Sequence, residues 1–286
     1  MRISKRTAVA VATVGTGAVL AGTAVMPAAA TAAGARTITV TVTGTSITLS
    51  TGTSVSAGFA RFVVKAPKGQ HTLQLLRLAP GYTPQQAGHD INAAFGGNLQ
   101  AIHRVDTKIR WFGGAAATPE RDGQFAETLY SGTYYFVDQE GNAKAQVTVT
   151  GTPTTTSSIA PSSTITAFNT KKGASRFSTG GARTLPRSGW TLFRDHADQP
   201  HFLVIQHVKD STTAKDIRAY QKSGGQSAPT WAAQGETDAG VISPDTQILF
   251  HYHLPAGKYV ITCFWPDAKT GMEHFAMGMW KLVTLK

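Results

Sequence analysis

The sequence predicts an all-β protein made of two tandem Greek-key β-sandwich domains, each with a short helical insertion. Its 286 residues are 41% hydrophobic and 15% charged, a balance typical of a chain that folds around a core. This length suits two domains at roughly 150 residues each. The 29 glycines, with many threonines and serines, favour short strands joined by turns over long helices.

The N-terminal segment, residues 1–33, is expected to be a cleaved secretory signal peptide. Arg2, Lys5 and Arg6 form a positive start, residues 8–26 are apolar and small, and residues 28–32 offer Ala-x-Ala cleavage sites. Several glycines make the apolar run weakly hydrophobic, which favours cleavage over a membrane anchor. We therefore expect a secreted, extracytoplasmic protein with no membrane span in its mature form.

The first domain is expected over residues 34–150, where apolar and polar residues alternate as in strands that bury one face. A helix is predicted at 84–95, because Thr83 can cap it and Pro84 suits the first helical position. Turn residues separate the predicted strands. These strands cover residues 36–50, 61–66, 71–78, 125–130, 133–138 and 144–150.

A linker is predicted at residues 151–162, which hold two prolines and few apolar residues. The second domain, residues 163–286, then repeats the order of the first. A strand that begins at His201 corresponds to the one at His71, and a helix at 212–222 corresponds to the earlier helix. Residues 129–138 also align without a gap to 254–263, which places Asp138 at the position of Cys263.

The charge of the chain is strongly basic, with 27 Lys and Arg against 16 Asp and Glu. An anionic cell-envelope polymer is therefore a candidate partner. The basic residues are scattered and no aromatic platform accompanies them, so we expect no nucleic-acid partner. A single cysteine excludes an internal disulfide framework and an iron–sulfur cluster.

The donors of a candidate metal site lie near the C-terminus. Cys263 is followed after ten residues by His274, and after four more by Met279. A thiolate, an imidazole and a thioether are soft donors that select copper, and a trigonal His2Cys site with a weak axial Met is the blue-copper arrangement. His201 opens a strand early in the domain, so it is the candidate for the second imidazole. Met277 remains the alternative to Met279.

These residues resemble the pattern of the cupredoxins. In that family a Pro-His opens a strand, a Pro-Gly-x-Tyr strand ends in Cys, and His-x4-Met precedes the last strand. Residues 163–286 match well, with Ala256 inserted between Pro255 and Gly257, whereas residues 36–150 resemble a degenerate copy without Cys or Met. The Cys-to-His loop is longer than in plastocyanin, although cupredoxin domains of copper nitrite reductases also carry a long loop.

The resemblance implies one type 1-like copper ion on His201, Cys263, His274 and Met279. It also implies electron transfer or copper handling, with a redox or copper-donor protein as partner. Such a site has no open position for a substrate, so we expect the protein not to be an enzyme.

The alternative is a metal-free extracytoplasmic binding or structural module, since a buried cysteine and methionine also serve as ordinary core residues. His251 and His253 share one face of a strand and form a second candidate metal patch, although solvated surface histidines explain them too. No hydrolase, metalloprotease or nucleotide-binding motif occurs. The carboxylates that flank one loop share no face, so they do not predict paired acid–base chemistry; they are Asp90, Asp106, Glu120 and Asp122.

Overall fold

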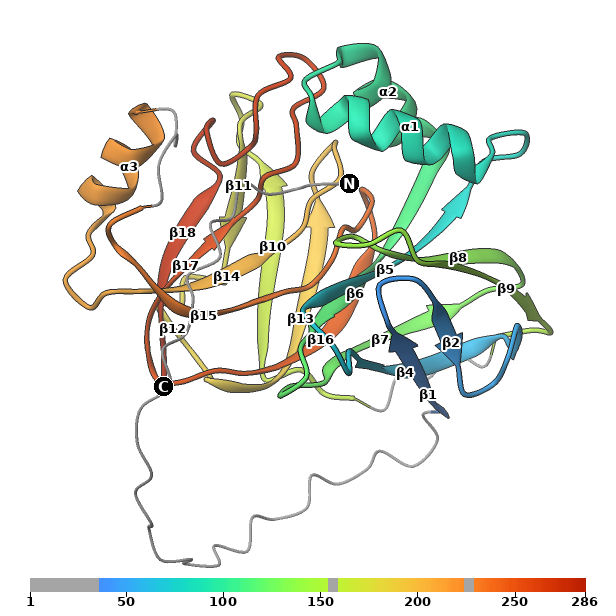
Figure 1. Cartoon of the computed structure of the whole chain (residues 1–286). Coiled ribbons are helices and arrows are strands. Elements are labelled where there is room, and N and C mark those ends of the chain that lie inside the picture. The colour runs from blue at the N-terminus through green and yellow to red at the C-terminus, as the bar shows by residue number, and fades with distance from the viewer. Residues whose placement is uncertain (1–35, 154–158, 224–228) are drawn as a thin grey trace, which may run out of the picture.

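The computed structural model describes residues 36–153, 159–223 and 229–286, and these form eighteen strands and three helices (Figure 1). The expected all-β fold with helical insertions is confirmed. The predicted signal peptide and residues 154–158 of the predicted linker lie outside the described residues. None of the helices in the described ranges has the length and apolar character needed to cross a membrane.

The first half contains two helices and nine strands. In chain order these are β1 (Arg36–Val42), β2 (Ile47–Leu49), β3 (Ser54–Ser56), β4 (Gly58–Lys65), β5 (His71–Leu78), α1 (Pro84–Phe95), α2 (Leu99–Lys108), β6 (Ile109–Ala117), β7 (Gly123–Leu129), β8 (Gly132–Asp138) and β9 (Lys144–Thr150).

The second half contains one helix and nine strands. In chain order these are β10 (Ser163–Asn169), β11 (Ser175–Ser178), β12 (Thr184–Leu185), β13 (Ser188–His196), β14 (Val204–Val208), α3 (Ala214–Lys222), β15 (Ala232–Asp238), β16 (Gln247–His253), β17 (Gly257–Thr262) and β18 (Trp280–Leu285).

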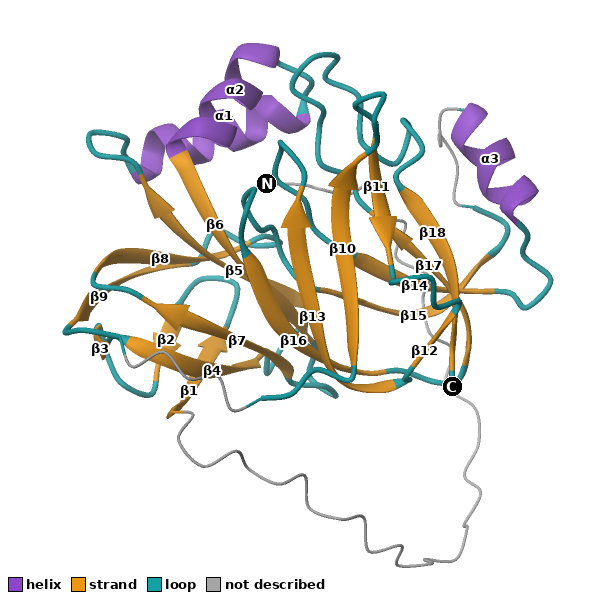
Figure 2. Ribbon diagram, turned by 180° about the vertical axis from the view of Figure 1, so that it is seen from behind, coloured by secondary structure: helices purple, strands orange, loops and turns teal. Residues whose placement is uncertain are grey.

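The two halves repeat one strand order. The sheet β3-β9-β8-β5-β6 of the first half has the same connectivity as β12-β18-β17-β14-β15 of the second. In each half these five strands face four strands of a shared eight-stranded sheet, whose order is β11-β10-β13-β16-β7-β4-β1-β2 (Figure 2). Parallel pairs recur at matching places, β1 with β4 and β10 with β13. The described strands therefore form two β-sandwiches joined edge to edge.

The helices begin where local capping groups satisfy their first amides. At α1 the Thr83 hydroxyl accepts from the Gln86 backbone N–H at 3.2 Å, and the Gln86 side chain accepts from the Thr83 N–H at 2.8 Å. At α3 the same reciprocal pair forms between Thr213 and Asp216, so the helix begins at Ala214, two residues after the predicted start at 212. In Figure 2, α1 and α2 lie together at one corner and α3 lies at the opposite side of the molecule.

The two halves meet where β7 pairs antiparallel with β16. Phe125 pairs with Phe250 in this ladder. These two phenylalanines are also equivalent when the ungapped alignment of residues 129–138 with 254–263 is extended back by four positions. Equivalent residues thus meet at the centre of the eight-stranded sheet, and one hydrophobic cluster runs through both halves. The domain limits and the independent folding of each half remain predictions.

A buried glutamine also joins the halves. The Gln74 side chain, 0% exposed, donates to the carbonyls of Gly113 and Val241 at 2.9 and 3.0 Å. Its Oε1 accepts from the Val241 N–H at 2.6 Å. Gly113 has a φ of +79°, a backbone conformation that residues with a side chain rarely adopt, so glycine is favoured at this position.

Candidate metal centre

The four predicted ligands are all buried in the second half. His201 lies just before β14, Cys263 directly follows β17, and His274 and Met279 lie in the loop that leads into β18. Their exposed fractions are 0% for His201, Cys263 and Met279 and 1% for His274. The Cys263 Sγ lies 3.8 Å from His274 Nδ1, and the rings of His201 and His274 have centroids 4.7 Å apart. The structure thus places the Cys263 thiol against the His274 ring and that ring against His201, but the ligand atoms of the three side chains do not all lie within 4.8 Å of one another.

Strand pairing explains why these distant residues meet. β14 and β17 are neighbouring antiparallel strands, and Val204 pairs with Thr262, so His201 and Cys263 emerge at the same end of the sheet. The backbone of His201 is fixed by reciprocal hydrogen bonds with Ile242, at 3.1 and 2.8 Å. Both donors therefore sit on ordered backbone rather than on free loops.

The long loop after Cys263 is held by its own hydrogen bonds. The His274 N–H donates to the Trp265 carbonyl, and the Met279 N–H donates to the His274 carbonyl, both at 2.8 Å. The Asp267 carboxylate accepts from the backbone N–H groups of Lys269 and Thr270 at 3.1 and 2.8 Å. Burial acts to raise the pKa of Asp267, but hydrogen bonds that include these two outweigh it and the pKa is lowered. The loop returns the chain to Cys263 in a defined conformation.

The two donors in contact are both neutral without a cation. Burial raises the pKa of the Cys263 thiol to about 12, against hydrogen bonds from the backbones of Phe202 and Trp265. Burial, and next the neighbouring His201, lower the pKa of His274 to about 3. The imidazole therefore keeps a free lone pair at ordinary pH, whereas the thiol needs a cation beside it to ionise.

The donor types, one thiol and two imidazoles, suit copper. The His201 Nδ1 lies 2.9 Å from Asp195 Oδ2, so the ring donates to the carboxylate and the lone pair is left on Nε2, which is buried without a hydrogen-bond partner. An unpartnered buried nitrogen is costly, and a metal would satisfy it. Ligand atoms at 2.0–2.3 Å from one ion at a trigonal angle are roughly 3.7 Å apart, close to the Cys263 to His274 distance.

The methionines occupy different environments. Met279 is fully buried in the hydrophobic cluster that surrounds Cys263. Met277 is partly exposed, and its sulfur accepts from the Thr270 hydroxyl at 3.7 Å. Met272 is 51% exposed. Met279 is thus the one of the three that is buried, as a weak axial ligand inside the core would be; its role stays a prediction.

The other candidates have local partners. His251 packs edge-on against Trp190 at 5.4 Å, and its pKa is lowered by burial and next by the nearby Arg61, whose charge disfavours a metal patch with His253. Asp90 is bonded to Arg104 through two contacts of 2.7 Å. His251 and Asp90 therefore make contacts that stabilise the fold, and they do not point to a second metal site.

A further cluster of candidate ligands lies in the first half, and the sequence pointed to two of its three residues. Among the described residues, the side chains of His71, Asp138 and Glu140 form the one group of three His, Cys, Asp or Glu whose ligand atoms all lie within 4.8 Å of one another. The alignment identified His71 and Asp138 as the counterparts of His201 and Cys263. Glu140 follows β8 by two residues, and nothing in its pattern distinguished it from a turn residue.

Comparisons with known proteins find likeness to solved structures alone: no protein-family model and no curated protein matches the sequence. An auracyanin from Roseiflexus castenholzii is 18% identical, with a TM-score of 0.28, over 44% of this chain and 99% of that one. A Cu-containing nitrite reductase from Thermus scotoductus SA-01 is 10% identical, with a TM-score of 0.23, over 87% of this chain and 61% of that one. A multi-copper oxidase from Pediococcus acidilactici is 8% identical, with a TM-score of 0.25, over 88% of this chain and 59% of that one. The fold assignment rests on the strand order and register of this chain itself.

Proposed function

We propose that this is a secreted cupredoxin-like protein that holds one type 1-like copper ion for electron transfer or copper handling. Cys263, His201 and His274 would be the equatorial ligands, and Met279 the weak axial one. The observation that carries the proposal is the buried contact of 3.8 Å between Cys263 Sγ and His274 Nδ1. The ring of His201, whose Nε2 has no hydrogen-bond partner, lies 4.7 Å from the ring of His274 between centroids. Secretion is supported by the N-terminal sequence pattern.

The protein's own contribution is to exclude water and to hold the donors in place. All four side chains are buried, and Asp195 fixes the ring of His201 by a hydrogen bond of 2.9 Å. When bound, copper would supply one-electron redox chemistry in a site that changes little in geometry. A redox or copper-donor protein and an anionic envelope polymer are the partners we propose. That the protein is not an enzyme stays a prediction.

A metal-free binding or structural module is the second candidate, and one observation favours it. Cys263 and Met279 both belong to a continuous hydrophobic cluster, and a thiol with a pKa near 12 is stable there as a neutral core group. In this reading the orphaned Nε2 of His201 is a cost that the fold tolerates.

Metal analysis of the protein secreted by its native host distinguishes the two candidates. The copper-binding proposal expects about one copper per chain, and loss of that copper in Cys263→Ser. Met279→Leu should alter the copper site, for which Met272→Leu is the matched control because Met272 is exposed and should leave the site unchanged. Protein that carries no copper, and takes up none after reduction and addition of Cu(II), would support the metal-free module.

A further inference from the structure

The first half carries a histidine and a carboxylate where the second half carries its candidate ligands. The β5–β8 and β14–β17 ladders have the same register, so His71 occupies the position of His201 and Asp138 that of Cys263. Both are buried, with exposed fractions of 9% and 6%. Glu140 adds a second carboxylate, and the ligand atoms of the three side chains lie within 4.8 Å of one another.

The hydrogen bonds of His71 assign a lone pair to its Nδ1. The Nε2 lies 3.0 Å from the carbonyl oxygen of Lys68, which can only accept, so Nε2 carries the proton. In a neutral imidazole the lone pair then belongs to Nδ1, which lies 2.8 Å from Asp138 Oδ2. Two lone-pair atoms at this distance repel each other unless a proton or a cation lies between them.

Negative charge accumulates around this pair. The Glu140 carboxylate accepts from the backbone N–H and the hydroxyl of Thr72, and that hydroxyl lies 3.1 Å from a third carboxylate, Asp238. Within the described ranges, no lysine or arginine forms an ion pair with Asp138 or Glu140. Two neighbouring carboxylates without a lysine or arginine ion pair form a setting that favours a bound cation.

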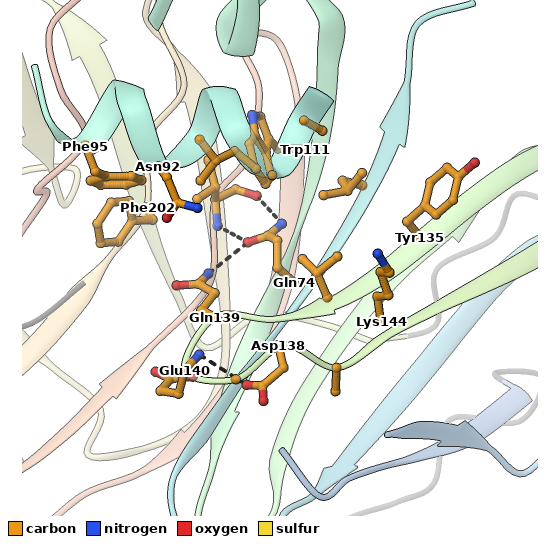
Figure 3. Close-up of a pocket in the computed structure, with 18 of the residues that line it drawn as sticks. Gln74, Asn92, Phe95, Trp111, Tyr135, Asp138, Gln139, Glu140, Lys144 and Phe202 are labelled. Carbon is orange, nitrogen blue, oxygen red and sulfur yellow. Dashed lines mark hydrogen bonds between the residues drawn. The ribbon is translucent and has the colours of Figure 1, made fainter. Parts of the chain in front are cut away.

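We propose that His71, Asp138 and Glu140 bind one divalent cation of the zinc class. One imidazole and two carboxylates suit a borderline ion better than a soft one, so this centre differs in metal preference from the thiolate site. Asp138 and Glu140 also line a cavity of about 520 Å³. Figure 3 shows these two carboxylates at one end of it and the aromatic residues Phe95 and Trp111 at the other. Three protein ligands leave a coordination position that water or another oxygen donor can occupy.

The test is calorimetric titration of Zn²⁺ into the full chain that carries Cys263→Ser. That background removes the thiolate of the proposed copper centre, so the outcome is independent of the proposed function. We expect one Zn²⁺ per chain at this cluster, and binding weakened at least about tenfold by Asp138→Asn and by Glu140→Gln. Both variants keep the local hydrogen bonds, because an amide can still accept from one neighbour and donate to the other.

Matched controls are Asp122→Asn and Glu120→Gln, which change the same groups on exposed positions of a loop and should leave Zn²⁺ binding unchanged. Absence of Zn²⁺ binding, or equal binding by the cluster variants and the controls, would overturn the proposal. A second measurement is the unfolding temperature with and without Zn²⁺. Saturating Zn²⁺ should raise it in the Cys263→Ser chain and much less when Asp138→Asn is added, and an equal rise in both also overturns the proposal.

Discussion

Among single residues, His274 has the most strongly shifted pKa of the candidate centre. It is buried, its Nε2 has no hydrogen-bond partner, and its pKa is lowered to about 3, first by burial and then by His201. The unfolded chain binds a proton at this residue near pH 6.5, whereas the folded chain does not bind it until the pH is near 3. The contribution of His274 to stability is therefore complete above pH 6.5 and falls as the pH drops toward 3.

We predict that His274→Leu removes this acid sensitivity. Between pH 5.5 and 4 the metal-free wild type should lose about 1.4 kcal/mol of unfolding free energy per pH unit relative to the variant, and less per unit nearer pH 6.5. Urea unfolding at several pH values measures this difference. The control His103→Leu changes an exposed histidine on α2 and should leave the slope at its wild-type value. Equal slopes for wild type and His274→Leu would show that His274 is accessible to protons in the folded state.

The donors were recognisable from sequence because they are rare residue types. Cys263 is the single cysteine, and Met279 belongs to a tight group of methionines. Their supporting carboxylate was not recognisable. Asp195 lies on β13 of the eight-stranded sheet, whereas His201 precedes β14 of the facing sheet, so only tertiary packing brings the two within 2.9 Å.

At the scale of elements, period-two alternation and helix caps located part of the fold. The predicted bounds of β5, α1 and β9 match the structure. The sequence did not predict β6, because eight of its nine residues are buried and several are glycine or alanine, so no alternation exists to be read. It also missed α2, a ten-residue helix that runs directly into β6 without a turn signal.

We predict that Gln74→Leu destabilises the chain by roughly 2–4 kcal/mol. The substitution leaves the Val241 N–H, the Val241 carbonyl and the Gly113 carbonyl without their side-chain partner in a buried junction. Gln146→Leu on the exposed face of β9 is the matched control, expected within about 0.5 kcal/mol of wild type. Chemical denaturation of both variants gives the comparison. Equal stability of the two variants would mean that the junction does not depend on this glutamine.

At the scale of the whole molecule, the two halves share one sheet and one continuous core. The ladder from Phe125 to Phe250 and the contacts of Gln74 cross between them. The sequence predicted the repeat but not this junction, because edge pairing between β7 and β16 leaves no local pattern in either strand.

We predict that a single protease cut within residues 151–162 leaves the halves associated. The composition of this segment favours cleavage there, and the crossing ladder and buried junction should hold the fragments together. Size-exclusion chromatography of the nicked protein should give one peak at the intact size, which separates into two fragments in denaturant. Fragments that separate in native buffer would show that the shared sheet contributes little to the assembly.

The claim that Cys263 is the thiolate ligand of a copper centre can be tested by adding Cu(II) to the reduced protein and recording its visible absorption. The claim predicts an intense thiolate-to-copper charge-transfer band that saturates near one copper per chain. Cys263→Ser should abolish the band, Met279→Leu should shift it, and Met272→Leu should leave it unchanged. A protein that stays colourless, or a band that survives Cys263→Ser, would contradict the claim.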